Sequence, residues 1–181
     1  IKLTQITIPS SVISIGDGAF YECSSLVQIT IPSSVISIGK NAFGGCSKLK
    51  TIFVDSNNPK YVSIDDVLFT KDFQTLICYA CKTKNTQYTI PSSVTSIEDG
   101  AFSYCSSLTQ ITIPSSVTSI GKNAFGGCSN LKTIFVDSNN PKYVSIDDVL
   151  FTKDFQTLIC YACKTKNTQY TIPSSVTSIE D

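Results

Sequence analysis

Apolar and polar residues alternate in short runs that recur along the chain. In the run LVQITIP, which starts at Leu26, the leucine and the two isoleucines are apolar, whereas Gln28 and Thr30 face the other way. A period of two residues predicts a β-strand. Pro32 ends the run and has no backbone N–H to donate, so we expect the strand to stop there.

The residues that follow the proline predict the rest of one coil. Two serines favour a corner, residues 35–38 run back across the unit, and Gly39 allows a second turn. Ala42, Phe43 and Cys46 then stand at i, i+1 and i+4. This spacing suits a short helical turn on the outer side of the coil.

The pattern recurs at fixed intervals. The marker Ile-Pro-Ser-Ser-Val begins at Ile8, Ile31, Ile90, Ile113 and Ile172. The intervals between markers alternate between 23 and 59 residues, which defines a duplicated cassette of 82 residues: copies at 3–84 and 85–166, and the start of a third at 167–181. A unit this short buries its apolar face only by stacking on its neighbours, so the sequence predicts a solenoid.

Each longer interval contains an insertion of 36 residues that is identical in both copies. In the first copy, residues 55–59 (DSNNP) are a strong loop signal. Residues 67–69 and 76–78 are short apolar runs that predict a β-hairpin. The exit at residues 88–90 rejoins the strand pattern in register, so we interpret the insertion as enlarged turns of the coil.

The motif L-x-x-I-x-I-P-x-S-V-x-x-I-G-x-x-A-F-x-x-C covers the chain from end to end and resembles the BspA-like, or treponemal-type, class of leucine-rich repeat. The insertion, with NNP at residues 57–59 and LICY at residues 76–79, looks like the elaborated unit of that class. The resemblance implies a β-rich leucine-rich-repeat solenoid, a right-handed horseshoe with a parallel concave β-sheet and short helical turns. It also implies an extracellular protein, on the cell surface or secreted, of a bacterium or parasitic protist that adheres to host proteins and cells.

We treat residues 1–181 as a single array, because a solenoid has no internal domain boundary. The chain contains no Met, starts inside a strand pattern and stops partway through a unit. We therefore expect it to be a fragment of a longer protein, whose localisation cannot be read from these termini. Localisation at the cell surface or outside the cell rests on the resemblance alone.

The charges are balanced, with 14 Lys against 14 acidic residues and no Arg. Arginine is the side chain best suited to phosphates and bases, so nucleic acid is not expected as a partner. The lysines are spread along the repeat, which gives no support to a polybasic membrane anchor or to membrane insertion.

Four of the eight cysteines, Cys23, Cys46, Cys105 and Cys128, occupy one phase of the repeat. A shared phase favours a stack of free, packed and unreactive thiols. Because adjacent coils are about 5 Å apart, disulfides from Cys23 to Cys46 and from Cys105 to Cys128 are the alternative.

The other four cysteines form two CxxC pairs, Cys78 with Cys81 and Cys160 with Cys163. They lie one cassette apart, about 15 to 20 Å, which is too far to share one zinc ion. Local disulfides or packed thiols are the two interpretations that remain.

Catalytic chemistry has little support. The chain has no His, and no nucleophile elbow, phosphate loop or zinc-protease motif occurs. Asp65 and Asp66 are adjacent carboxylates that we interpret as turn residues, and residues 55–58 lack the Gly and terminal Glu of a calcium loop. We predict no enzyme, no metal and no cofactor.

The outward positions of the concave strands are polar and uncharged, apart from two phenylalanines. They are Gln5, Thr7, Gln28, Thr30, Thr51, Phe53, Gln87, Thr89, Gln110, Thr112, Thr133 and Phe135. Exposed aromatic rings often anchor protein interfaces, so we predict protein binding here. In the alternative, the insertion folds over Phe53 and Phe135 and buries them.

The sequence thus predicts a non-enzymatic module for adhesion and protein binding, which engages a host extracellular-matrix or cell-surface protein. Either the concave strands or the insertions make the contact, and duplication would present each weak site twice. The alternative function is a structural spacer or self-assembling surface scaffold, whose open solenoid ends meet other copies.

Overall fold

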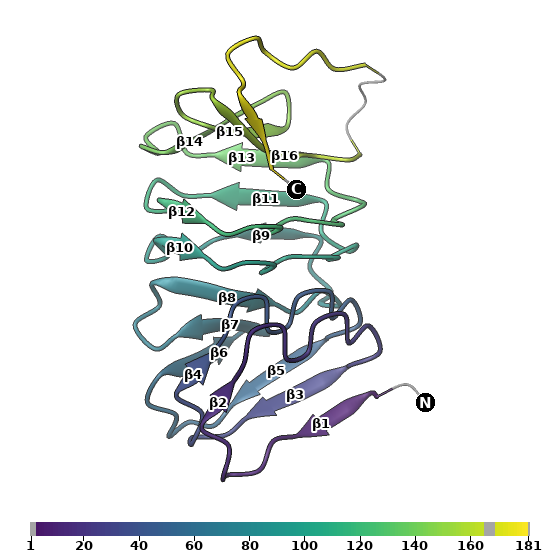
Figure 1. The fold of residues 1–181 in the computed structure, drawn as a ribbon, viewed down its shortest axis with the longest axis vertical. Coiled ribbons are helices and arrows are strands. Elements are labelled where there is room, and N and C mark those ends of the chain that lie inside the picture. Colours follow the sequence, from purple (N-terminus) through teal and green to yellow (C-terminus); the bar gives the residue numbers. More distant parts are fainter. Residues whose placement is uncertain (1–2, 165–168, 181) are drawn as a thin grey trace.

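The chain winds into a β-solenoid whose coils stack along the long axis of the molecule (Figure 1). The structure is a computed structural model that describes residues 3–164 and 169–180. The first strand, β1 (Gln5–Thr7), lies at one end of the stack, and residues 143–161 lie near the other. The predicted solenoid is confirmed.

The alternating runs form the predicted strands on one side of each coil. The first three are β1 (Gln5–Thr7), β3 (Gln28–Ile31) and β5 (Thr51–Val54), and the next three are β9 (Gln87–Thr89), β11 (Gln110–Ile113) and β13 (Thr133–Val136). All neighbours pair in parallel, but in two separate three-stranded sheets, because the insertion intervenes between β5 and β9. The single concave sheet expected from the resemblance is therefore interrupted between β5 and β9.

Short return strands form the opposite side of each coil. They are β2 (Ser14–Ile15), β4 (Ser37–Ile38), β10 (Ser96–Ile97), β12 (Ser119–Ile120) and β17 (Ser178–Ile179). The strands β2 and β4 pair in parallel, as do β10 and β12. Apolar side chains such as Ile29, Ile31 and Val35 fill the space between the two sides and are fully buried.

Each insertion is an antiparallel meander of three strands. In the first cassette these are β6 (Tyr61–Ile64), β7 (Val67–Thr70) and β8 (Thr75–Tyr79), and in the second β14 (Tyr143–Ile146), β15 (Val149–Thr152) and β16 (Thr157–Tyr161). The predicted hairpin is confirmed as β7 and β8, whereas β6 was not predicted. The last strand of each meander then pairs in parallel with a return strand, β8 with β10 and β16 with β17, so the insertion is part of the coil.

The outer turns are not helical, and the prediction of short helical turns is wrong for the described residues. In the first outer turn the amides of Gly18, Phe20 and Glu22 donate to carbonyl oxygens of the next coil, those of Lys40, Ala42 and Gly44. Gly18 and Glu22 have positive φ, which an α-helix does not accept. The apolar spacing was read correctly, but only every second amide bonds within its own turn, such as Tyr21 N–H to the Gly18 carbonyl oxygen, while the others bond to the next coil.

Candidate functional site

The residues predicted for protein binding lie on the solvent side of the two parallel sheets, and we call this surface the Gln/Thr/Phe face. Two cross-strand ladders run over the first sheet: Gln5–Gln28–Thr51 and Thr7–Thr30–Phe53. The second sheet repeats them: Gln87–Gln110–Thr133 and Thr89–Thr112–Phe135. The structure thus brings the predicted residues together in two equivalent groups, one per cassette, rather than in one continuous row.

One phenylalanine lies on the edge strand of each group, Phe53 on β5 and Phe135 on β13. Phe53 is 50% exposed and Phe135 is 51% exposed, although both are large apolar side chains. The alternative in which the insertion buries these rings is therefore wrong. Each sheet offers one exposed ring bordered by neutral Thr and Gln side chains.

The path of the insertion explains why it leaves the rings uncovered. After β5 the chain turns towards the return strands, where β8 joins β10. The apolar residues of the meander, Val67, Leu68 and Phe69, enter the core and are at most 2% exposed. The insertion therefore covers the interior of the coil. Its β6–β7 turn projects, where Ile64 is exposed and Asp65 and Asp66 have positive φ, as predicted for turn residues.

Comparison with family models gives a match over the whole chain. The BspA type leucine rich repeat region matches residues 1–78 and 71–181, with six copies of the repeat. The chain belongs to the BspA-type leucine-rich repeat family. A comparison with curated proteins finds no match.

One solved structure supports the leucine-rich-repeat fold, and two others show a weaker likeness. A leucine-rich repeat protein from Eubacterium ventriosum is 26% identical, with a TM-score of 0.68 over 98% of this chain and 54% of that one. A leucine rich cell surface protein from Faecalibacterium prausnitzii is 26% identical (TM-score 0.46, 97% and 59%), and a leucine-rich repeat protein from T. pallidum is 30% identical (TM-score 0.42, 74% and 58%). The chain spans little more than half the length of these relatives.

The sequence analysis missed the role of Asn58, which it assigned only to a loop. The side chain is 1% exposed, and its amide nitrogen donates to the carbonyl oxygens of Pro32 and Val35 at 2.8 and 3.0 Å. Its amide oxygen accepts from the backbone of Lys60 and Tyr61, at 2.8 Å in both cases. One buried asparagine therefore joins the start of the insertion to the corner of the preceding repeat. Asn140 makes the same contacts in the second cassette.

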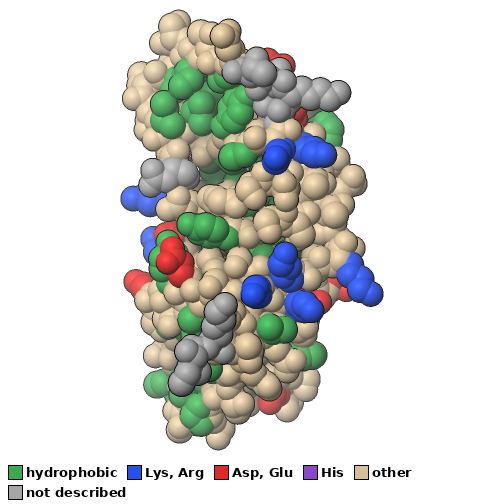
Figure 2. Space-filling view, turned by 90° about the vertical axis from the view of Figure 1, so that its right-hand side faces the viewer, with side chains coloured by type: hydrophobic (Ala, Val, Ile, Leu, Met, Phe, Trp, Pro, Cys, Tyr) green, Lys and Arg blue, Asp and Glu red, His purple; other side chains and the backbone are tan. Residues whose placement is uncertain are grey.

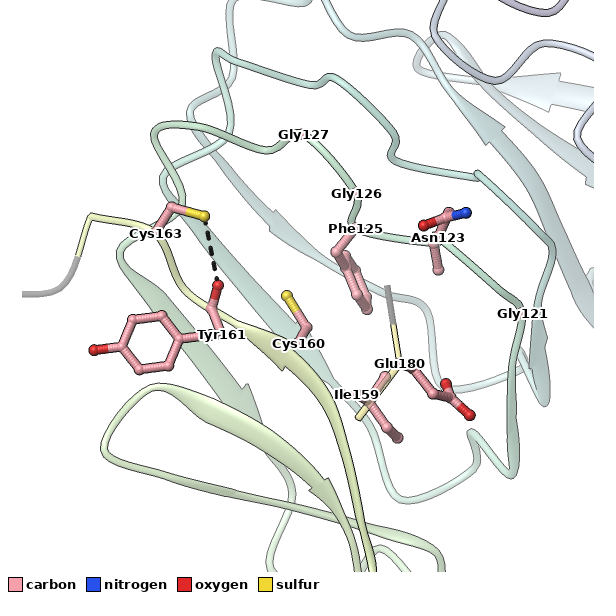
Figure 3. A pocket seen from close by; sticks show the side chains of 11 residues that line it. Gly121, Asn123, Phe125, Gly126, Gly127, Ile159, Cys160, Tyr161, Cys163 and Glu180 are labelled. Atoms are coloured by element: carbon pink, nitrogen blue, oxygen red, sulfur yellow. Dashed lines mark hydrogen bonds between the residues drawn. The ribbon is translucent and has the colours of Figure 1, made fainter. Parts of the chain in front are cut away.

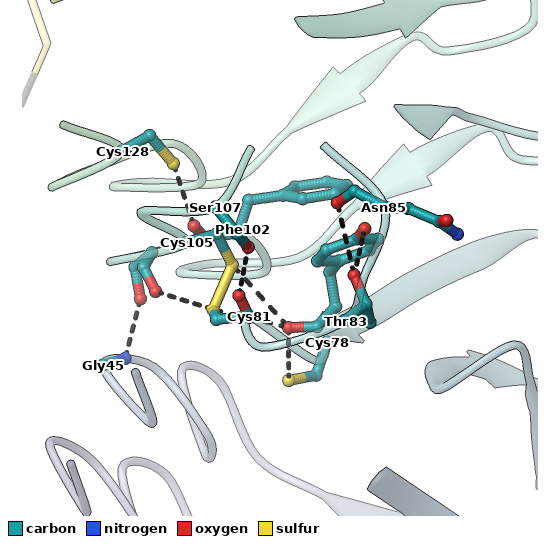
Figure 4. The surroundings of a disulfide bond; sticks show 11 residues. Gly45, Cys78, Cys81, Thr83, Asn85, Phe102, Cys105, Ser107 and Cys128 are labelled. Atoms are coloured by element: carbon teal, nitrogen blue, oxygen red, sulfur yellow. Dashed lines mark hydrogen bonds between the residues drawn. A yellow bond between two sulfur atoms is a disulfide. The ribbon is translucent and has the colours of Figure 1, made fainter. Parts of the chain in front are cut away.

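The prediction of four free thiols in one phase of the repeat is wrong for one cysteine. Cys105 forms a disulfide with Cys81, 24 residues away, so it is not a free thiol of the ladder (Figure 4). Cys23, Cys46 and Cys128 are free, and neither of the disulfides considered for the ladder is present. The bond links the end of the insertion to the outer turn of the following repeat.

The CxxC pairs are not local disulfides. Cys78 is a buried free thiol, while its partner in the motif is bonded to the next coil. In the second cassette Cys160 is partly buried and Cys163 is exposed, and both are free. No three side chains of His, Cys, Asp or Glu gather as a metal site would require within residues 3–164 and 169–180.

Burial makes the ladder thiols poor nucleophiles. It raises the pKa of Cys46 and of Cys128 to about 12, because the thiolate would lose its hydration. The thiol hydrogen of Cys46 is also donated to the carbonyl oxygen of Phe20. These groups therefore remain protonated at neutral pH.

We expect iodoacetamide at about pH 8 to label Cys163 first and to leave Cys46, Cys78 and Cys128 unmodified in the folded protein. Peptide mapping by mass spectrometry measures the order, with the urea-unfolded protein as the control in which all free cysteines react. Rapid native labelling of Cys128 would contradict the packing described above.

The raised pKa of Cys128 also makes the stability of the fold depend on pH. Its contribution is fully present below the unfolded pKa of about 8.5 and is lost as the pH rises towards 12.

A pocket of about 160 Å³ lies between β16 and the outer turn that contains Gly126 and Gly127 (Figure 3). Cys160 lines it, and burial raises the pKa of this thiol to about 12. In the first cassette the corresponding surface is covered by the outer turn at residues 100–105, where Phe102 stacks on Tyr79 at 5.3 Å between ring centroids. The pocket is therefore a surface on which coils stack, and Glu180 also lines it.

The charges of this leucine-rich repeat protein do not form a continuous band on the side shown in Figure 2. Lysine side chains stand in separate groups there, with neutral side chains between them. No helix of the described residues is long and apolar enough to cross a membrane.

Proposed function

We propose that the Gln/Thr/Phe face binds protein ligands, and that the chain is a non-enzymatic adhesion module of a cell-surface or secreted protein. The observation that carries this proposal is the half exposure of Phe53 and Phe135 at the same position of two equivalent faces. Exposed aromatic rings often supply the anchor of a protein interface, which supports this proposal. Leucine-rich repeat solenoids are typically binding scaffolds, and one similar solved protein is described as a cell surface protein.

The chemistry of the face defines the partner. Each ring lies next to a ladder of Thr hydroxyls and Gln amides, with no charged side chain in either ladder. Such a surface fits an apolar side chain surrounded by backbone or neutral polar groups of a host extracellular-matrix or cell-surface protein. Because the two faces are duplicates, a partner that spans both gains avidity without any new contact.

The double variant Phe53→Asp/Phe135→Asp tests the proposal. We expect it to bind immobilised extracellular-matrix proteins and epithelial cells at least about 30-fold more weakly, because both anchors are replaced by hydrated charges. Both rings are half exposed, so the variant should melt within a few degrees of the parent protein. Surface plasmon resonance and cell-binding assays give the readout.

The matched control is Ile64→Asp/Ile146→Asp, which places the same charges on the projecting turns of the two insertions. These isoleucines are also half exposed, at 47% and 45%. If the isoleucine variant loses binding and the phenylalanine variant retains it, the insertions are the binding surface instead. If the parent protein binds no ligand, and its mass by light scattering rises between about 1 and 100 µM, the scaffold function replaces adhesion.

A further inference from the structure

The outer turns of the four short repeats form a second surface, which shares no residue with the Gln/Thr/Phe face. They comprise residues 18–23, 41–46, 100–105 and 123–128. Their backbones bond in that spatial order: Phe20 N–H donates to Ala42 in the first cassette, and Phe102 N–H donates to Ala124 in the second. Gly45 N–H donates to the Ser103 hydroxyl at 2.8 Å and joins the two cassettes. The insertions have no such turn, so the four turns are neighbours.

The fifth position of each turn carries an unusual backbone conformation. Its occupants are Glu22, Gly45, Tyr104 and Gly127, with φ of 55°, 76°, 59° and 68°. Glycine adopts this region without cost, whereas a bulky tyrosine is a rare occupant because its Cβ crowds the backbone. The Tyr104 ring is 47% exposed, so burial in the core does not explain its presence. A strained, exposed aromatic residue suggests a function for the side chain.

The alternation of large and small residues leaves a hollow on each side of Tyr104. On one side, Glu22 and Tyr104 border a hollow of about 180 Å³ over Gly45. On the other, Tyr104 and Tyr21 line a hollow of about 260 Å³ over Gly126 and Gly127. A Cβ added to Gly127 would lie 2.8 Å from the Tyr104 ring, so the glycine leaves room for this ring beside the hollow.

The lining chemistry is aromatic, polar and free of cations. Two exposed tyrosine rings, the Asn41 and Asn123 side chains and the Ser103 hydroxyl line the larger hollow, and the Glu22 carboxylate lines the smaller one. Aromatic faces pack against C–H groups, and amides, hydroxyls and carboxylates bond to hydroxyl groups. A ring with one C–H face and hydroxyl groups at its edge meets both requirements.

A peptide fits this surface less well. The backbone groups that an added strand would need are already used between coils: Glu22 N–H donates to Gly44, and Tyr104 N–H donates to Gly126. The linings consist of tyrosine rings, glycine and polar side chains, without the deep aliphatic pit that an apolar peptide anchor needs.

We propose that the outer turns bind a neutral carbohydrate, with the Tyr104 ring as the stacking platform between two hollows that each accept a sugar unit. The site occurs where the cassettes differ: Tyr21 and Glu22 in the first correspond to Ser103 and Tyr104 in the second. It is therefore formed once, from outer turns of both cassettes, unlike the duplicated Gln/Thr/Phe face.

Tyr104→Gly is the decisive variant, because glycine already occupies the equivalent position of two other turns, at Gly45 and Gly127. The change removes the ring and the unfavourable backbone conformation together, so the variant should melt at the same temperature as the parent or higher. Neutral hexaoses of glucose, mannose and N-acetylglucosamine, each at a concentration of about 10 mM, are screened for binding by saturation-transfer NMR. At least one should bind, and Tyr104→Gly should weaken it about tenfold or more.

Two further variants make the result specific. Gly127→Ala should also weaken sugar binding, because the added methyl group would lie 2.8 Å from the Tyr104 ring and push the stacking platform out of place. Phe53→Asp/Phe135→Asp should bind the sugar like the parent, which separates this site from the proposed protein-binding face. The absence of binding by every hexaose, or equal binding by Tyr104→Gly and the parent, would overturn the proposal and leave the protein-binding function unaffected.

Discussion

Replacing Asn58 by Ala is expected to lower the free energy of unfolding by about 3–5 kcal/mol, a large effect for a residue in a surface-like DSNNP segment. The side chain is 1% exposed and makes four hydrogen bonds of 2.8 to 3.0 Å. Alanine leaves two carbonyl oxygens and two amide groups without these partners. Each buried group that is left unpaired costs about 1–3 kcal/mol, and partial access to water reduces the sum.

The neighbouring Asn57→Ala is the matched control, because Asn57 is exposed and only its backbone N–H bonds, to the Asp55 carboxylate. Urea unfolding followed by circular dichroism gives both free energies. We expect Asn57→Ala to unfold like the parent protein, and Asn140→Ala to reproduce the effect in the second cassette. Equal midpoints for the Asn58 and Asn57 variants would show that these hydrogen bonds do not hold the insertion in place.

Asn58 also illustrates what a sequence pattern leaves open. Asn-Asn-Pro correctly predicts a change of direction, because these residues favour turns. The pattern does not indicate which side chain points inwards, since that depends on carbonyl oxygens of Pro32 and Val35 more than twenty residues earlier. Burial of a polar side chain is a property of the assembled coil, and local propensity does not report it.

The strands were predicted well because their signal is local. The alternation of Ile29 and Ile31 with Gln28 and Thr30 fixes which side chains face the core, and Pro32 marks the end of β3. The helical turn was predicted wrongly, because the spacing of Ala42, Phe43 and Cys46 fits both a helix and a turn that bonds to its neighbour. Positive φ at Asn41 and Gly45 excludes the helix.

The cysteines show the limit of an argument from repeat phase. Equal phase predicts equal neighbours only where the adjacent coils are alike. Cys105 follows an insertion and meets Cys81, whereas Cys128 follows a short repeat and donates its thiol hydrogen to Phe102. The exposure of Phe53 could not be predicted from the sequence for the same reason, because it depends on the path that the insertion takes after β5.

Replacing Phe102 by Ala is expected to lower the free energy of unfolding by about 3–5 kcal/mol. The ring is fully buried and lies between Tyr79 and Phe125, with ring centroids 5.3 and 5.4 Å apart. These three rings come from the first insertion and from two outer turns of the second cassette, so they form one aromatic stack across the boundary. A cavity here removes packing from both cassettes at once, because the surrounding coils cannot close on it.

Phe53→Ala is the control for Phe102→Ala, since it deletes the same ring from a half-exposed position and should cost less than about 1 kcal/mol. Urea unfolding also reports the slope of the transition, which follows the surface exposed in one cooperative step. A solenoid is stabilised through contacts between neighbours, so loss of the stack at the boundary should lower this slope as the cassettes begin to unfold separately. An unchanged midpoint and slope would mean that the aromatic stack does not couple the two cassettes.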